Sequence, residues 1–598
     1  MFCQWARRLL ISGDGLLRGF RWQFLVLVTA LALFFASLLS RSSNPVDTPP
    51  PATDPPSPAA SEIPATLTPF ALLTPETSST SVITYREALV GSVQRLNPLF
   101  AGLNPVDRDI TSLIFEGLTR TNRYGEPEPA LAKEWVISSD GLEYIVTLRE
   151  DVLWQDGLPF TSADVAYTMA LLRSPDFNGP AELGAFWRTV ETEVLGDYLV
   201  RFRLTQPLAS FPDALRIGIL PEHALRGTTA AQLASHPFNL SPIGTGAYQL
   251  ETLQSGSDGA VKAVNLRVAP VYRQRPEGKT GYALERVSFR LYDSFEEVLS
   301  ALQNGDVDGL AARNRNERIP LLNSGANVLT ALEPTLGALI FNWNQDETRF
   351  FREQRVRRAL ETGLQRASII ERHLPNVAVK ADSPILPGSW AYVSELPWPP
   401  YDPNSARQLL ETASLQSGEN SGNAESTAEP TSNVLFSFEI LTLDDPALVN
   451  MAHEIAAQWS QYNLDVRVES VDVNTYQTRL EAGDFDAALV ELSLGDSADP
   501  DVYEFWDQEF PEGRNYGRVN DRRIIESLEA ARRDPNGINR AIHYRNFQRN
   551  FVERAIAIPL YYPLFSYALS PNVNGVQLGF IGSPADRFRN IKDWTINS

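Results

Sequence analysis

The most constraining feature of this 598-residue chain is the stretch from Tyr144 to Leu172, where a strand pattern leads directly into a helix pattern. Apolar and polar residues alternate from Tyr144 to Leu148, which is the period of a strand with one buried face. A turn is expected at Gln155-Asp156-Gly157, because glycine adopts a positive φ at little steric cost. Thr161 precedes Asp164 at capping-box spacing, and helical periodicity follows. The stretch predicts a strand, a turn and a capped helix.

The same stretch resembles a signature of the family 5 extracellular solute-binding proteins, the peptide, dipeptide and nickel receptors of bacterial ABC importers. The matching positions, in order, are Leu148, Arg149, Val152, Trp154, Asp156, Gly157, Pro159, Phe160, Thr161, Asp164 and Val165. We expect Trp154 and Phe160 to lie in a core and Asp164 to be a helix cap rather than a catalytic acid. The resemblance implies an α/β protein with a two-lobed, periplasmic-binding-protein-like type II fold and an extra small domain inserted in the first lobe.

Further motifs extend this resemblance over residues 83 to 598. The segments that match family patterns are 91–98, 114–118, 129–142, 242–248, 305–310, 338–342, 355–360, 401–413, 494–501, 515–517 and 556–563. The sequence departs from the family at 414–433, a polar, low-complexity stretch that we predict to be a disordered insertion. Between 445 and 492, helix and strand patterns alternate quickly, which favours a parallel α/β arrangement.

We predict seven segments from these motifs. They are a cytoplasmic flank and transmembrane signal-anchor at 1–41, a Pro/Ser/Thr-rich disordered linker at 42–82, the first part of lobe I at 83–120, the inserted small domain at 121–238, the second part of lobe I at 239–335, lobe II at 336–555 and the C-terminal return to lobe I at 556–598.

The apolar stretch from Trp22 to Ser40 contains no charged residue. As a helix it would span about 28 Å, close to the roughly 30 Å hydrocarbon core of a bilayer. The preceding flank carries several arginines, which favours a cytoplasmic N-terminus and an extracytoplasmic remainder. We therefore expect a single-pass protein of the cell membrane, with its globular part in the periplasm or at the cell exterior. Cleavage of this segment near residues 36–40 is the alternative.

The composition argues against several kinds of partner and site. The formal net charge of −21 would repel phosphate backbones, so nucleic acid is not expected as a partner. The single cysteine, Cys3, rules out an internal disulfide and a thiolate metal cage. The five histidines show no short ligand spacing, and Gly244 and Gly246 lack the lysine and hydroxyl of a phosphate loop. We expect no cofactor, no metal, no catalytic residue and a monomeric protein.

The resemblance also suggests ligand contacts. Relatives hold an extended peptide by backbone hydrogen bonds, in the manner of an added strand. Asp496 corresponds to the aspartate that pairs with the ligand's α-amino group in dipeptide and oligopeptide receptors, although a solvated turn would explain it equally well. Trp390 and Tyr392 resemble an aromatic loop near the ligand, and core packing is the alternative for both. No arginine matches the carboxylate-binding arginine of dipeptide receptors.

The function implied is a membrane-tethered substrate-binding protein of an ABC transporter. It would capture oligopeptides or dipeptides in a closing cleft between two lobes and deliver them to permease subunits. Two alternatives stay open: a membrane-anchored peptide sensor or chaperone without a permease, and a receptor for a nickel chelate, sugar or haem. An extracytoplasmic hydrolase is disfavoured, because no nucleophile elbow, metal motif or convincing carboxylate pair is present.

Overall fold

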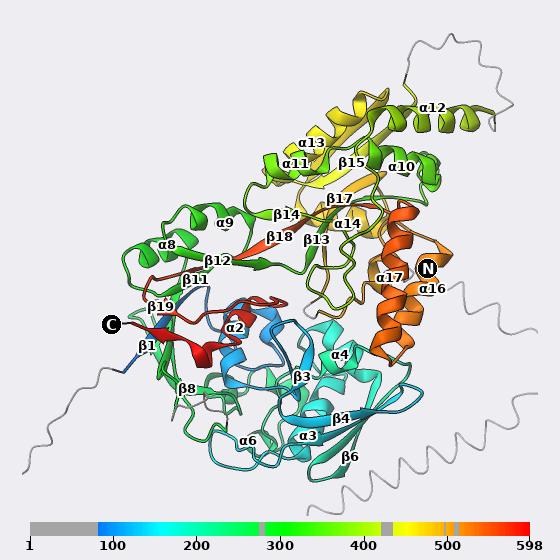
Figure 1. Cartoon of the computed structure of the whole chain (residues 1–598). Helices are drawn as coiled ribbons and strands as arrows, with labels where there is room; N and C mark the ends of the chain where they lie inside the picture. The colour runs from blue at the N-terminus through cyan, green and yellow to red at the C-terminus, as the bar shows by residue number, and fades with distance from the viewer. Residues whose placement is uncertain (1–81, 274–280, 420–433, 496–497, 508–512, 598) are drawn as a thin grey trace, which may run out of the picture. The chain divides into compact units, whose positions relative to one another are not determined.

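The computed structural model describes residues 82–273, 281–419, 434–495, 498–507 and 513–597 (Figure 1). By its internal contacts the chain divides into two units, Met1–Ser79 and Thr80–Ser598, and every described residue belongs to the second. The predicted anchor at Trp22–Ser40 and the linker at 42–81 therefore lie outside the described residues. In the part of the chain that is described, no helix is long and apolar enough to cross a membrane.

A mixed 12-stranded sheet is the framework of this unit, with the order β16-β15-β17-β13-β18-β11-β1-β10-β9-β8 and with β12 and β14 paired to β18. Its strands are β1 (Thr84–Val90), β8 (Tyr248–Ser255), β9 (Val261–Val268), β10 (Arg286–Tyr292), β11 (Gly309–Ala311), β12 (Asn327–Leu332), β13 (Thr335–Phe341), β14 (Ala378–Lys380), β15 (Phe436–Leu443), β16 (Leu464–Val471), β17 (Ala487–Ser493) and β18 (Ile558–Leu569).

The long strand β18 joins the two halves of this sheet, as its red ribbon shows (Figure 1). Its residues 558–561 pair with β13, and its residues 564–569 pair with β12. The chain also crosses from β12 through Glu333 into β13, antiparallel to β18. The two crossings run side by side, and Glu333 N donates to Pro563 O at 2.9 Å. Paired crossings of this kind are where two lobes can bend relative to each other.

Buried apolar side chains form separate cores in the two lobes. In the first lobe, strand and helix residues such as Tyr85 and Ile110 belong to one large cluster. In the second lobe the sheet carries a cluster on each face, since Leu339 belongs to one and its neighbours Ala338 and Ile340 belong to the other. This arrangement confirms the predicted two-lobed α/β fold. The domain boundaries given above stay predictions.

Helices pack around these sheets. Outside the small domain they are α2 (Pro105–Ile114), α8 (Phe295–Gln303), α9 (Arg315–Leu322), α10 (Gln354–Thr362), α11 (Arg366–His373), α12 (Pro403–Glu419), α13 (Pro446–Ser460), α14 (Val473–Ala482), α15 (Tyr503–Trp506), α16 (Arg522–Arg533) and α17 (Gly537–Glu553). The C-terminal segment adds the short strands β19 (Val573–Asn574) and β20 (Thr595–Ile596) and the 3-10 helix η4 (Pro584–Phe588).

The small domain is built on an antiparallel four-stranded sheet with the order β4-β5-β7-β6, and α3 and α4 pack against it. Its elements, with a preceding hairpin, are β2 (Thr119–Thr121), β3 (Pro127–Pro129), β4 (Ala132–Ile137), β5 (Glu143–Leu148), α3 (Ser162–Arg173), α4 (Ala181–Arg188), β6 (Val190–Gly196), β7 (Leu199–Leu204), α5 (Phe211–Ala214), α6 (Glu222–Leu225) and α7 (Ala230–Leu233).

The predicted strand, turn and capped helix are all confirmed in this domain. Gly157 has a φ of +92°. Ala163 N donates to Thr161 Oγ1 at 3.3 Å, and Thr161 N donates to Asp164 Oδ2 at 2.9 Å, which completes the capping box. Trp154 and Phe160 are fully buried, as predicted.

The second lobe agrees with the prediction in one respect and differs from it in another. Its helices and strands alternate, and β15 pairs in parallel with both β16 and β17, which confirms the parallel arrangement predicted for 445–492. On its other side β17 pairs antiparallel with β13, which lies outside that range. The reason is that β13 enters from the hinge crossing rather than through a crossover helix. In addition, α12 continues to Glu419, so the segment predicted to be a disordered insertion at 414–433 begins in a helix. Residues 420–433 lie outside the described residues.

A buried charge cluster fastens the C-terminal segment to the first lobe. Arg587 of η4 donates through Nε to Glu87 Oε1 of β1 at 2.8 Å, and its Nη2 lies 2.7 Å from Asp109 Oδ2 of α2. Glu87 Oε2 accepts from the hydroxyls of Tyr85 and Tyr567 at 2.7 and 2.8 Å. The side chains of Arg587 and Glu87 are both 0% exposed, so these charges face each other without water.

Candidate functional site

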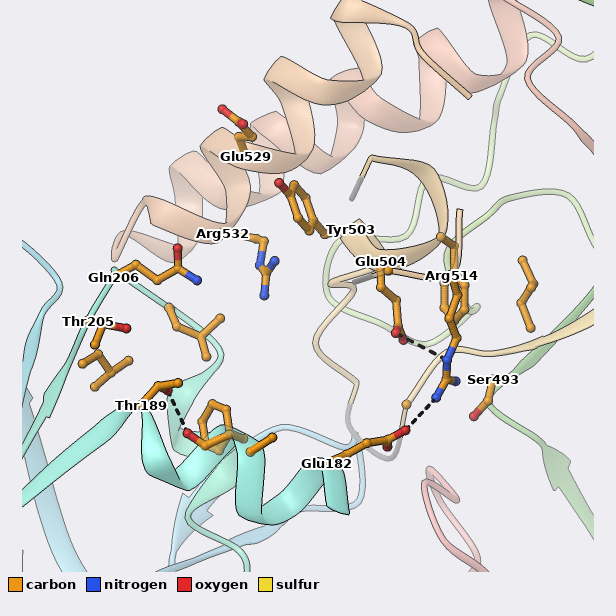
Figure 2. A pocket seen from close by; sticks show the side chains of 18 of the residues that line it. Glu182, Thr189, Thr205, Gln206, Ser493, Tyr503, Glu504, Arg514, Glu529 and Arg532 are labelled. Carbon is orange, nitrogen blue, oxygen red and sulfur yellow. Dashed lines mark hydrogen bonds and ion pairs between the residues drawn. The ribbon is translucent and has the colours of Figure 1, made fainter. Parts of the chain in front are cut away.

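A cavity of about 1640 Å³ lies between the small domain and the second lobe. The small domain contributes α4 and the chain on either side of the β6–β7 hairpin, and the second lobe contributes α14, α15, α16 and the end of β17 (Figure 2). This volume exceeds the roughly 300–1,000 Å³ of ordinary small-molecule pockets. The cavity therefore has room for a ligand of several residues.

Direct contacts connect the two walls around the cavity. Ala209 N, beyond β7, donates to Arg532 O at 3.0 Å. Arg514 Nη2 of the second lobe lies 3.4 Å from Glu182 Oε1 of α4, an ion pair that Figure 2 marks with a dashed line. Ala498 N donates to Gly125 O of the β2–β3 turn at 3.2 Å. The walls thus meet at several points, while the space between them stays open.

One edge of β17 is free along this cavity. Leu494 N donates to Pro334 O at 2.7 Å, so the backbone of Leu494 faces β13. In an antiparallel ladder, residues that face one neighbour alternate with residues that face the other way. Glu491 and Ser493 therefore turn their amide and carbonyl groups away from β13. The strand on that side, β15, pairs with β17 only at 487–488.

Glu491 and Ser493 are exposed, and both line the cavity. Among the described residues, neither has a backbone hydrogen-bond partner on the side away from β13. The free stretch begins after Leu489, whose carbonyl accepts from the Tyr476 hydroxyl at 2.7 Å. An unpaired strand edge is a template on which an extended chain can add as a further strand.

Charged residues of α15, of α16 and of the segments on either side of α15 form the neighbouring wall. Arg532 Nε lies 3.0 Å from Asp501 Oδ2, and its guanidinium carbon lies 4.5 Å from the centre of the Tyr503 ring. Arg514 Nε lies 3.8 Å from Glu504 Oε2. Burial raises the pKa of Asp501 and that of Glu504, and the adjacent arginines oppose both shifts. The wall thus alternates cationic and anionic groups.

The side chain of Glu491 connects the cavity to the hinge. Its Oε1 pairs with Arg315 Nη2 of α9 and accepts from the Tyr561 hydroxyl of β18 at 2.8 Å. Arg315 Nη1 lies 3.0 Å from Asp445 Oδ1, the residue that caps α13. Hinge-side elements therefore fix the side chain of a residue whose backbone faces the cavity.

Of the site residues expected from the sequence, Trp390 and Tyr392 do not line this cavity. Asp496 lies outside the described residues. Trp390 packs on Tyr544 with ring centres 5.8 Å apart, and Arg540 lies 5.1 Å from the centre of its ring. Tyr392 N donates to Ser389 O at 3.1 Å, and burial raises the pKa of its hydroxyl. Neither aromatic residue lines the cavity, so their roles as ligand contacts stay predictions.

The space beside this aromatic loop is small. It is lined by Ser389, Leu494 and Asp499, among others, and has a volume of about 10 Å³, which is no more than one water molecule needs. Asp499 forms a buried ion pair with Arg540 at 2.8 Å. Asp499 therefore holds α17 against the loop after β17, a structural role.

Sequence reasoning missed the residues that line the large cavity. Glu491 and Ser493 belong to an ordinary alternating strand pattern. Only the pairing of β17 with its neighbours shows that their backbone groups have no partner strand on one side. Arg532 lies on an amphipathic helix far along the chain from Asp501, and no local motif links the two. The described residues contain no group of three or more His, Cys, Asp or Glu side chains that could hold a metal ion.

Comparison with known proteins agrees with the architecture. The chain is 24% identical over 515 residues to the oligopeptide-binding protein AppA of Bacillus subtilis, which covers 84% of this chain and 90% of AppA. The crystal structure of that AppA with a nonapeptide superimposes with a TM-score of 0.60 at 22% identity, covering 86% of this chain and 99% of AppA. NikZ from Campylobacter jejuni in complex with Ni(L-His) superimposes with a TM-score of 0.61 at 25% identity, with the same coverage.

Residues 126–512 match the family described as "Bacterial extracellular solute-binding proteins, family 5 Middle". This match covers more than half of the sequence, and the described fold has the two lobes and the small domain expected from the motifs. The chain belongs to the family 5 bacterial extracellular solute-binding proteins.

Proposed function

We propose that this protein is the extracytoplasmic receptor of an ABC importer and that it captures peptides in the cavity between the small domain and the second lobe. The observation that carries the proposal is the free edge of β17 at Glu491 and Ser493, which faces this cavity. An extended peptide can satisfy these amide and carbonyl groups and its own at the same time. The similarity to an oligopeptide-binding protein supports the same ligand class.

Backbone recognition fits a receptor for many sequences. Hydrogen bonds to the main chain do not depend on the peptide's side chains, and successive side chains of an added strand point to alternate sides. The large cavity leaves space for those side chains together with water, which mediates hydrogen bonds at modest cost. Affinity would then come from the backbone, and sequence preference would be weak.

We further propose that the protein is tethered to the membrane as a monomer. The charge-free segment Trp22–Ser40 would be the anchor, and the Pro-rich segment at 42–82 would be an extended spacer. The globular unit would then face the periplasm or the cell exterior, where it could meet both the solute and the permease subunits. Residues 1–81 of these segments precede the described residues.

The replacement Ser493→Pro tests the binding mode. Proline removes the amide hydrogen of residue 493, which faces the cavity and not β13, so the ladder with β13 stays intact. Losing one backbone hydrogen bond should weaken peptide binding about threefold to tenfold. Ser493→Ala keeps the amide hydrogen and should bind like the wild type. The affinities are measured by isothermal titration calorimetry on the purified globular unit with a set of penta- to nonapeptides.

The proposal fails if the wild-type protein binds none of these peptides. The assigned edge is wrong if Ser493→Pro binds them as tightly as Ser493→Ala does. Circular dichroism and the unfolding temperature of each variant ensure that folded proteins are compared.

A nickel chelate is the second candidate, and the similarity to NikZ favours it. Mass spectrometry of small molecules released on denaturing the freshly purified protein separates the two ligand classes. A mixture of short peptides supports the first proposal, whereas a single metal chelate would support the second.

A further inference from the structure

We propose that a groove on the outer face of the first lobe binds a sugar phosphate, at a site separate from the peptide cavity. The groove crosses β1, β8, β9 and β10 and has a volume of about 630 Å³, which is typical of a small-molecule pocket. Among the described residues, the groove and the cavity have no lining residue in common. Figure 1 shows β1 and β8 on the left, apart from α4 and α16, which border the cavity.

Strand alternation determines which side chains enter the groove. Val287 and Phe289 of β10 belong to the core of the first lobe. Arg286, Ser288 and Arg290 of the same strand therefore point to the opposite face. Helix α8 packs over the ends of β1 and β10 on that face, and the groove continues from there over the open part of the sheet.

A row of three polar side chains crosses the groove. Thr252, Asn265 and Ser288 lie opposite one another on β8, β9 and β10. Asn265 and Ser288 are each only 7% exposed, although they lie on the open face. Asn265 Nδ2 donates to Thr252 Oγ1 at 2.9 Å, and neither Asn265 Oδ1 nor the Ser288 hydroxyl has a hydrogen-bond partner among the described residues. Polar groups buried this deeply need a partner, so these two are available to a ligand.

Two arginines stand beside this row. Arg286 is paired with Glu251 at 2.6 Å, which fixes it against the sheet. Arg290 has no carboxylate partner among the described residues. It lies beside Tyr292, where burial raises the pKa of the phenol and Arg290 opposes that rise. The guanidinium of Arg290 is therefore the cation that can receive an anion, and its planar fork of N–H groups matches phosphate oxygens.

The charges around the groove leave it positive. Lys262 also lines it, and its ammonium lies 3.6 Å from Asp258 and 4.0 Å from Asp293. Both carboxylates are more than half exposed, so water and salt screen their attraction for Lys262. The lining residues include three cations and the single anion Glu251, on a chain whose formal net charge is −21.

These groups together fit a phosphate that carries hydroxyl groups. Arg290 and Lys262 can donate to phosphate oxygens, and the Ser288 hydroxyl can donate or accept. Asn265 Oδ1 only accepts, so a bare inorganic anion would leave it unpaired, whereas a sugar hydroxyl can donate to it. A neutral sugar would leave Arg290 without an anion. A sugar phosphate satisfies both.

Isothermal titration calorimetry on the purified protein tests this, with glucose 6-phosphate, glucose and inorganic phosphate as probes at low ionic strength. The wild type should bind glucose 6-phosphate at least about tenfold more tightly than either of the others. Arg290→Gln removes a charged hydrogen bond and should weaken binding of glucose 6-phosphate about tenfold to a hundredfold, whereas Arg290→Lys should keep part of the affinity. Ser288→Ala should weaken it about threefold to tenfold.

Arg545→Gln is the matched control, because it removes the same charge from an exposed position on α17 in the second lobe and should keep the wild-type affinity. The inference is overturned if the wild type does not bind glucose 6-phosphate, or binds glucose or inorganic phosphate equally well. It is also overturned if Arg290→Gln, shown to be folded by circular dichroism, keeps the wild-type affinity. None of these measurements uses a peptide, so the inference and the proposed function can fail independently.

Discussion

We expect Arg587→Met to destabilise the first lobe strongly, because Arg587 pairs with two buried carboxylates. The arginine contacts both Glu87 and Asp109, and the Glu87 carboxylate has no exposed surface. Methionine fills similar space but supplies neither charge nor hydrogen bonds. The variant would therefore bury Glu87 with only the hydroxyls of Tyr85 and Tyr567 as partners.

Removing one partner of a buried ion pair costs about 3–5 kcal/mol in the free energy of unfolding. Unfolding entropy near the midpoint is about 2.1 cal/mol/K per residue, so the unit from Thr80 to Ser598 has roughly 1 kcal/mol/K. The unfolding temperature should accordingly fall by about 3–5 °C at pH 8. Differential scanning calorimetry measures this shift directly.

The same variant should show a pH signature. Burial raises the pKa of Glu87, while Arg587 and the two tyrosine hydroxyls lower it, so loss of Arg587 raises this pKa further. A carboxyl with a raised pKa in the folded state keeps a proton that the unfolded chain releases. Its contribution to stability therefore falls as the pH rises above 4.5, the ordinary pKa of a glutamate. The destabilisation of Arg587→Met relative to the wild type should therefore grow between pH 5 and pH 8.

Two results would refute this reasoning: a shift below 1 °C at pH 8, or the same shift at pH 5 and pH 8. Arg522→Met is the control, because Arg522 and its partner Glu526 are largely exposed. Exposed pairs contribute little, so this variant should unfold at the wild-type temperature.

Two further predictions concern the second lobe and the hinge. Burial raises the pKa of Glu361 to about 7, so the contribution of Glu361 to stability should fall as pH rises from about 4.5 to 7. Glu361→Gln does not titrate, and its unfolding temperature should rise relative to the wild type between pH 5 and pH 7 and stay level above. A constant difference across this range would contradict the assignment. Arg315→Met should leave Asp445 and Glu491 without their shared cation and lower the unfolding temperature by a few degrees. Adding Glu491→Gln should restore part of that loss in a double-mutant cycle, and strictly additive shifts would argue against the coupling.

Local patterns made the strand, turn and capped helix predictable, because the contacts that define these elements join residues close in sequence. Thr161 and Asp164 are three residues apart, and their spacing alone indicates the capping box that forms. The charge cluster of the first lobe is the opposite case, since Arg587 and Glu87 are separated by 500 positions. Nothing in the neighbourhood of either residue distinguishes it from an ordinary surface charge.

The candidate site escaped prediction for the same reason. Alternation indicates which residues of β17 share a face, but only the order of strands in the sheet determines which backbone groups lack a neighbour. On one side of β17 lies β13, which enters from the hinge crossing. On the other side, β15 overlaps β17 only at 487–488.

The position of Glu491 explains how a strand edge exposed to a cavity can remain ordered without a ligand. Its backbone faces the cavity, whereas its side chain is fixed by Arg315 and Tyr561, and Leu492 on its other side belongs to a buried cluster. A peptide that adds to this edge therefore meets groups already held in strand geometry, and the conformational entropy lost on binding is mainly its own. Because Arg315 and Tyr561 belong to hinge-side elements, this carboxylate connects the hinge to the binding edge in addition to the backbone pairing through β13.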